Sequence, residues 1–103
     1  MRVIDKHNFE EAINGPTPVL VDFWNTACLS CWQAVPALKQ LEIAYRDRIL
    51  IAKYNVDTDI GIIERFNINK VPYFIFFKDG GPKFTVEGFK NIMDLEKKIR
   101  EFL

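Results

Sequence analysis

The feature that most constrains the fold of this chain is a strongly apolar segment that is followed closely by two cysteines. Residues 19–24 contain a single polar side chain, that of Asp22. Such a run is typical of a strand in a parallel sheet that helices cover on both faces. Cys28 and Cys31 come after a short turn, and apolar side chains then recur near helical spacing to about residue 46. We therefore predict a buried strand, a turn, and a helix that carries both cysteines at its start.

The start of a helix is a favourable place for a reactive thiolate. Several backbone N–H groups are unpaired there, and they carry roughly half a positive charge. The thiolate is the reactive form of cysteine, and lowering the thiol pKa from about 8.5 makes it available. Cys28 and Cys31 are also close enough in sequence to close a disulfide on each other. The sequence therefore predicts a reversible dithiol/disulfide pair.

The composition is that of one folded domain without a strongly charged surface. The chain has 103 residues, 49% of them hydrophobic, which suffices for one core but not for two, so we expect a single domain over residues 1–103. The 14 basic and 14 acidic side chains cancel, which argues against nucleic acid or an anionic membrane as a partner. Charged side chains occur within residues 1–7, before any apolar run that is long enough for a targeting signal. We therefore expect a cytoplasmic protein.

Two cysteines are too few for a secreted scaffold stapled by disulfides, so in a reducing compartment the pair is either catalytic or metal-binding. A structural zinc site usually needs four protein ligands. Besides the two cysteines, the chain offers only one histidine, His7. A zinc site within one chain is therefore not expected, although a site shared between two chains stays open. We expect no metal and no cofactor.

The rest of the chain alternates between strand and helix patterns. Turn residues at 15–18 end a first helix that begins with a cap at Asn8, and those at 79–82 mark a hairpin. The other predicted elements are strands at residues 3–4, 49–55, 73–77 and 83–87, a short helix capped by residues 57–59 and ending near Phe66, and an amphipathic helix at 91–103. This order predicts an α/β domain.

With this order established, the chain resembles the thioredoxin family over essentially its whole length. The residues that carry the resemblance are 21–24 ahead of Cys28 and Cys31, then Pro36, 52–57, 66–72, 77–80 and Gly88. The resemblance implies the thioredoxin fold, with a central mixed sheet of five strands flanked by four helices. It also implies a cis peptide bond between Val71 and Pro72 that faces the disulfide, where the backbone pairs with an extended substrate segment.

The active site departs from the family pattern. Where the family has Trp-Cys-Gly-Pro-Cys, this chain has Ala27-Cys28-Leu29-Ser30-Cys31. Ser30 restores a backbone N–H group and adds a hydroxyl, and both can donate a hydrogen bond to a thiolate. Leu29 adds a branched apolar group beside the exposed sulfur, and Ala27 removes a large aromatic side chain. Trp32 stands where the family usually has a lysine.

We expect thiol–disulfide exchange in which the two cysteines have different roles. Cys28, at the exposed start of the helix, attacks a substrate disulfide as a thiolate, and Cys31 then resolves the mixed disulfide. Burial of Asp22 is expected to raise its pKa, so that it can act, directly or through a water, as the base that deprotonates Cys31. The alternative is a strand-end acid that is simply solvated. In the family, Lys53 of the neighbouring strand pairs with this acid.

Six further residues are expected to bind or shape the substrate: Trp24, Leu29, Ser30, Trp32, Val71 and Pro72. Trp24 is expected to pack beneath the active-site loop, with plain core packing as the alternative. Trp32 either belongs to the contact surface or folds back onto the domain. Pro72 is expected to shape the substrate groove.

These features support functions of two different classes. The first is a cytoplasmic, monomeric protein-disulfide reductase of electron transport and cell redox homeostasis, which acts on disulfide-containing proteins and is recharged by a thioredoxin-reductase-like electron donor. An isomerase or oxidant is a variant of this class, favoured if Ser30 strongly stabilises the thiolate. The second is a thioredoxin-fold binding or chaperone-like module with little turnover, which the altered residues around the cysteines favour.

Overall fold

The structure, a computed structural model, describes all 103 residues and shows the helices and strands in the predicted order. The elements are β1 (Arg2–Ile4), α1 (Phe9–Ile13), β2 (Val19–Trp24), α2 (Leu29–Ala44), β3 (Leu50–Asn55), the 3₁₀ turn η1 (Val56–Thr58), α3 (Ile60–Phe66), β4 (Tyr73–Lys78), β5 (Gly81–Glu87) and α4 (Ile92–Arg100). Their ends differ from the predicted bounds by a few residues, as element ends commonly do. None of the helices combines the length and the apolar character needed to cross a membrane.

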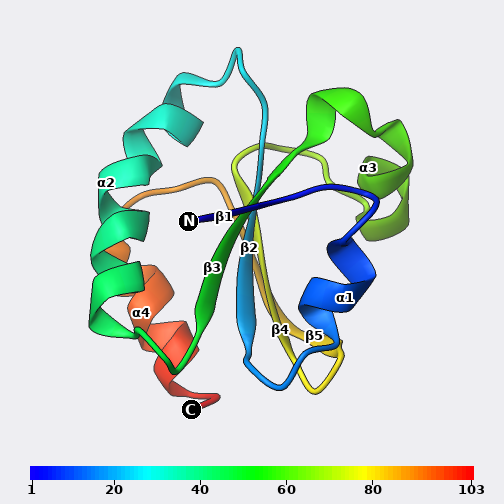
Figure 1. The fold of residues 1–103 in the computed structure, drawn as a ribbon. Coiled ribbons are helices and arrows are strands. Elements are labelled where there is room, and N and C mark those ends of the chain that lie inside the picture. The colour runs from blue at the N-terminus through cyan, green and yellow to red at the C-terminus, as the bar shows by residue number, and fades with distance from the viewer.

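The five strands form one sheet in the order β1-β3-β2-β4-β5, with β2 at its centre. β1 and β2 run parallel to β3, whereas β4 runs antiparallel to both β2 and β5. All residues of β2 before Trp24 are buried, as the apolar run predicts. The predicted mixed sheet of five strands flanked by four helices is therefore confirmed (Figure 1).

The helices lie in two layers, one on each face of the sheet, because successive side chains of a strand point to opposite faces. Val21 and Phe23 of β2 pack with α1 and α3 on one face. Leu20 packs with residues of α2 and α4, and these two helices lie on the other side of the sheet (Figure 1). By the same alternation Asp22 points to the face that α2 covers, and this places its carboxyl group on the side of the helix that carries the cysteines.

The start of α1 differs from the predicted cap. Asn8 makes no side-chain bond to the helix; its Oδ1 instead accepts the backbone N–H of Asp5 at 2.8 Å. The Asp5 carboxylate accepts the backbone N–H of His7 at 2.8 Å. These bonds fold residues 5–8 into a turn ahead of α1, so Asn8 holds the predicted N-cap position but lacks a side-chain bond to the helix. The cap of α3 is confirmed, since Asp59 Oδ1 accepts the Ile62 N–H at 3.3 Å.

Candidate active site

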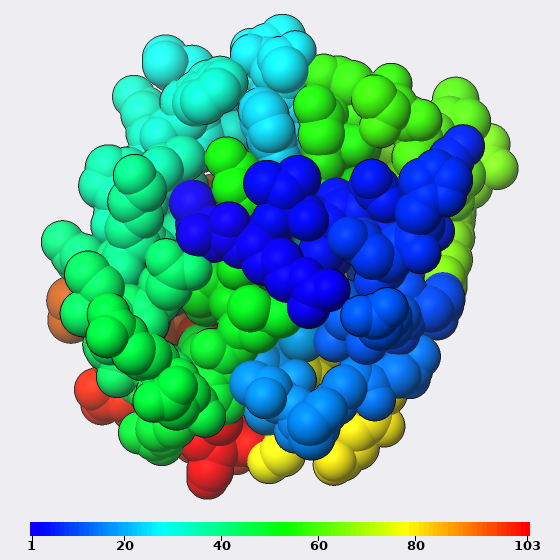
Figure 2. Space-filling view, viewed as in Figure 1, coloured from blue at the N-terminus to red at the C-terminus, as the bar shows by residue number.

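The two cysteines lie where the loop after the central strand enters α2. The loop follows β2 after Trp24 and forms the projecting end of the molecule at the top of Figures 1 and 2. Cys28 and Cys31 are joined by a disulfide with a Cα–Cα distance of 5.3 Å. The predicted disulfide pair is therefore present at the start of a 16-residue helix.

Cys28 is the N-cap residue of α2, and its sulfur takes the place that a capping oxygen usually has. Cys28 Sγ accepts the backbone N–H of Cys31 at 3.1 Å. The Ser30 hydroxyl lies 3.3 Å from the same sulfur and is the donor, since a disulfide sulfur carries no hydrogen. Both donors would also bind a thiolate at this atom, and the helix N-terminus favours the negative charge.

The two sulfur-bearing residues differ in their access to solvent. Cys31 is only 2% exposed, whereas Cys28 is half-buried and lies between exposed Ala27 and exposed Leu29. Leu29 is 71% exposed, so its apolar side chain stands free beside the accessible sulfur. An incoming disulfide therefore meets Cys28 first.

A contact that the sequence analysis did not single out fixes the loop to the neighbouring strand. Thr26 donates both its backbone N–H and its hydroxyl to Asp57 Oδ2, at 3.1 and 3.0 Å. Asp57 lies in η1, directly after β3. Since β2 and β3 are parallel, the residues that follow them meet at one edge of the sheet. The two predicted strands were therefore the sequence signal from which a contact between Thr26 and Asp57 could have been expected. The capping prediction for residues 57–59 holds only for Asp59.

Trp32 folds back onto the domain, which is one of the two alternatives for this residue, and about half of it stays at the surface. Its indole N–H donates to the Thr26 carbonyl at 3.1 Å. Its ring meets the Trp24 ring edge to face, with 5.3 Å between centroids and 71° between planes. The Trp32 side chain is nevertheless 48% exposed. Trp24 thus packs against Trp32 of the first turn of α2.

Asp22 is a buried carboxyl group without a hydrogen-bond partner in the protein. The residue is 1% exposed, and neither carboxyl oxygen receives a hydrogen bond. Burial raises the pKa of Asp22 to about 7, and the positive charge of Lys53 opposes this rise. A simply solvated acid at the strand end is therefore excluded, and the carboxyl group titrates near neutral pH.

Lys53 lies beside Asp22 in the sheet but does not form an ion pair with it. The two residues are register partners on β2 and β3, yet the Asp22 oxygens have no hydrogen-bond partner. The Lys53 ammonium lies instead over aromatic rings, 4.5 Å from the Trp24 centroid and 5.7 Å from that of Trp32. The pairing that the resemblance implied is therefore replaced by a cation–π arrangement.

The peptide bond between Val71 and Pro72 is cis, as the resemblance implied. Tyr73, the next residue, pairs with Phe23 of β2. Pro72 therefore lies beside the end of β2 from which the loop to the cysteines departs. Its carbonyl accepts the Gly88 N–H at 2.7 Å, which ties the segment before β4 to the end of β5.

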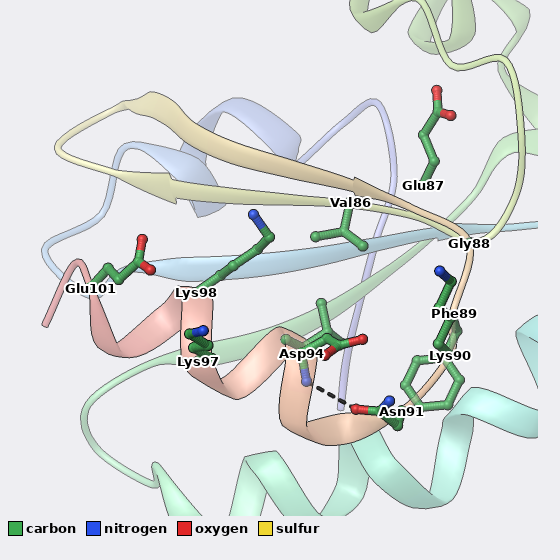
Figure 3. Close-up of a pocket in the computed structure, with 11 residues that line it drawn as sticks. Val86, Glu87, Gly88, Phe89, Lys90, Asn91, Asp94, Lys97, Lys98 and Glu101 are labelled. Carbon is green, nitrogen blue, oxygen red and sulfur yellow. Dashed lines mark hydrogen bonds between the residues drawn. The ribbon is translucent and has the colours of Figure 1, made fainter.

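A groove of the molecule lies away from these residues. It has a volume of about 440 Å³ and runs between β5 and α4 (Figure 3). Its charged lining balances three lysines against three acids, namely Lys90, Lys97, Lys98, Glu87, Asp94 and Glu101. No group of three or more His, Cys, Asp or Glu side chains is arranged to hold a metal ion.

Comparison with known proteins agrees with this geometry. The sequence profile of the family described as Thioredoxin matches residues 1–101. The chain belongs to the thioredoxin family. It is 36% identical to a thioredoxin of Alicyclobacillus acidocaldarius over 96 residues, which cover 93% of this chain and 91% of that protein. It is 33% identical to a thioredoxin-like protein of Synechocystis, over 93% of this chain and 92% of the relative.

A third relative contains more than this fold. The chain is 32% identical to a bifunctional thioredoxin reductase/thioredoxin of Mycobacterium leprae, over 87% of this chain but 20% of that protein. Thioredoxins are protein-disulfide oxidoreductases, and this member of the family carries the cysteine pair at the expected place. The chain is therefore a thiol–disulfide oxidoreductase.

Proposed function

We propose that this protein reduces disulfides of other proteins, with Cys28 as the attacking residue and Cys31 as the resolving residue. The observation that carries the proposal is the unequal placement of the two sulfurs at one helix start. Cys28 is the half-buried N-cap with two hydrogen-bond donors on its sulfur, and Cys31 is buried behind it. This placement supports an accessible nucleophile and a protected second thiol.

In the proposed reaction, the Cys28 thiolate attacks one sulfur of a substrate disulfide. A mixed disulfide forms, and the other substrate sulfur leaves as a thiolate that takes a proton from water. The Cys31 thiolate then attacks Cys28 Sγ, the Cys28–Cys31 disulfide forms, and the second substrate sulfur leaves. The substrate gains two electrons and two protons, and the protein is left oxidised in the form that the structure describes.

Asp22 is proposed as the base that removes the proton from Cys31. A base works best when its pKa lies near the operating pH, and burial raises the pKa of Asp22 to about 7. Its position on the face that α2 covers supports access to the Cys31 side. Since Asp22 makes no hydrogen bond to Cys31 in the disulfide form, we propose that the proton passes through a water.

The substrate is proposed to dock on the surface around Cys28. Leu29 and Trp32 offer exposed apolar area there, which is typical of protein contact sites when it surrounds a functional group. Val71 and Pro72, directly before β4 and beside the end of β2, would pair with an extended substrate segment. Ser30 would donate a hydrogen bond to the reacting sulfur. Trp24 would support this surface through its contact with Trp32.

Reduction has to be followed by recharging, because each turnover leaves the protein oxidised. We propose a thioredoxin-reductase-like electron donor, which the relative that joins a reductase to a thioredoxin supports. We further propose that residues 1–103 act as one domain, since the two cores pack on opposite faces of one sheet. We also propose that the protein is a monomer and that it transfers electrons in the cytoplasm.

One observation favours a second candidate, a disulfide oxidant or isomerase. The Ser30 hydroxyl points at Cys28 Sγ at 3.3 Å, and a hydroxyl donor stabilises the thiolate over the disulfide. Such stabilisation makes the disulfide more oxidising, because it favours the reduced form. The equilibrium reduction potential, titrated in dithiol buffers and followed by tryptophan fluorescence, distinguishes the two candidates. A value near −270 mV, about that of thioredoxin, supports the reductase, and one above about −200 mV supports the oxidant or isomerase.

The roles of the cysteines are tested with Cys28→Ser and Cys31→Ser, in reduction of a disulfide-bonded protein such as insulin. Cys28→Ser should lose nearly all activity, whereas Cys31→Ser should accumulate a mixed disulfide that non-reducing electrophoresis detects. Faster alkylation of Cys31 than of Cys28 in the reduced protein would reverse the assignment. A partner that remains bound to both variants without any turnover would favour the binding module instead.

A further inference from the structure

The Lys53 ammonium lies over two aromatic side chains although a buried acid lies beside it in the sheet. Its nitrogen is 4.5 Å from the Trp24 ring centroid and 5.7 Å from the Trp32 centroid. Asp22, its register partner, has two buried oxygens that accept nothing. Lysine has a flexible four-carbon stem, so the choice between rings and carboxylate depends on what surrounds the ammonium.

We propose that Trp32 is a positioning residue that holds the Lys53 ammonium over the tryptophan pair and away from Asp22, and so keeps Asp22 fit to accept the proton of Cys31. The inference rests on the proposed role of Asp22 as a base. It assigns a function to the one aromatic residue that stands where the family usually has a lysine. A lysine at this position would offer no ring to the ammonium.

Trp32 is itself fixed on three sides, which allows it to position another group. Its indole N–H donates to the Thr26 carbonyl at 3.1 Å, and its backbone N–H donates to the Cys28 carbonyl at 3.3 Å. Its ring stands on Trp24. Thr26 is tied in turn to Asp57 by two hydrogen bonds. The face that Trp32 presents to Lys53 is therefore set by the active-site loop.

The groups around Asp22 make Lys53 the dominant electrostatic influence on it. β3 contributes Lys53, the charged group that acts on the carboxyl. On β4 the register partner is Phe74, which is uncharged. α2 contributes Cys31 from its first turn, and this residue does not titrate while it is in the disulfide. Burial has the largest effect on the proton affinity of the carboxyl group, and the distance to Lys53 sets how far the positive charge opposes that effect.

The test is a ¹³C NMR titration of the Asp22 carboxyl carbon in the oxidised full-length protein, with Asp22→Asn used to assign the signal. In Trp32→Ala the ammonium is free to approach Asp22, and the pKa of Asp22 should fall by about one pH unit, a tenfold loss of proton affinity. Trp32→Phe keeps a ring for the ammonium, so its Asp22 should titrate closer to the wild type than that of Trp32→Ala.

Removal of Trp32 also admits water to Asp22, and a second background separates this effect from that of the lysine. In Lys53→Met the Asp22 pKa should rise, because the opposing positive charge is gone. Adding Trp32→Ala to Lys53→Met should then change the pKa little. Three results would each overturn the proposal. They are an Asp22 pKa that falls equally in both backgrounds when Trp32 is replaced by Ala, an Asp22 pKa that does not fall in Trp32→Ala, and an Asp22 pKa that falls further in Trp32→Phe than in Trp32→Ala.

This titration does not depend on the role of Asp22 in turnover. The base role is measured separately, as the pH dependence of mixed-disulfide release in Asp22→Asn. An unchanged profile in that variant would refute the base role even if Trp32 controls the titration. A normal base role combined with an Asp22 pKa that Trp32 does not influence would refute only the positioning role.

Discussion

Replacing Asp22 by Asn should stabilise the oxidised protein at alkaline pH, because the wild type buries a carboxyl group that must ionise there. The pKa of Asp22 is raised from 3.8 to about 7 by burial. Below about pH 4 the group is protonated in both the folded and the unfolded chain, so it has no electrostatic cost. Between pH 4 and 7 the unfolded chain releases its proton first, and the free energy of unfolding therefore falls as the pH rises.

The size of this effect follows from the same pKa difference. One pH unit of difference corresponds to about 1.4 kcal/mol, so the rise from 3.8 to about 7 amounts to a loss of about 4 kcal/mol above pH 8. Asn has the same shape and does not titrate. The free energy of unfolding of Asp22→Asn minus that of the wild type should therefore increase by about 4 kcal/mol between pH 4 and pH 8.

Urea unfolding of the oxidised proteins at a series of pH values, followed by tryptophan fluorescence, measures this difference. The matched control is Asp94→Asn, which removes one negative charge from an exposed position on α4. Its difference from the wild type should vary by less than about 1 kcal/mol over the same range, as is usual for exposed charges. A difference for Asp22→Asn that stays constant from pH 4 to pH 8 would refute the argument that burial controls this carboxyl group.

Three further outcomes are expected from single substitutions. Ser30→Ala removes a donor to Cys28 Sγ and should slow iodoacetamide alkylation of reduced Cys28 about tenfold at pH 7, since hydrogen bonds to charged groups contribute about 1.5–3 kcal/mol. Thr26→Val loses one of two bonds to η1 and should lower the free energy of unfolding by about 1 kcal/mol in urea, whereas Thr26→Ser should retain it. Leu38→Ala, on the buried face of α2, should cost about 2–5 kcal/mol in the same assay, and exposed Ile43→Ala less than about 0.5 kcal/mol.

Much of the fold could be predicted because the local patterns and the buried faces agree. The central strand is apolar in sequence and buried in the structure, so its place inside the sheet follows from its run of apolar residues. The bonding at the start of α1 could not be predicted in this way. Asn8 holds the predicted N-cap position, but its side chain binds the backbone of Asp5 rather than that of the helix.

The active site could likewise be predicted only in part. The cysteine pair and its place at a helix start follow from spacing, and the burial of Asp22 follows from the strand around it. The orientation of Lys53 does not follow from sequence, since a flexible ammonium has both a carboxylate and two aromatic rings within reach of its stem. The structure places it over Trp24 and Trp32, and it is the geometry of the loop that makes these rings available.

The stability and the proposed chemistry of this protein make opposite demands on Asp22. A close ion pair with Lys53 would offset part of the cost of the buried charge, but it would also lower the pKa of the carboxyl group and weaken it as a base. A cost of about 4 kcal/mol is large beside the 5–15 kcal/mol that typically holds a domain together. The proposed positioning by the tryptophan pair favours the chemistry, because the rings bind the ammonium without bringing it to Asp22. The same carboxyl that weakens the fold at alkaline pH is thereby kept near the pH at which a thiol must lose its proton.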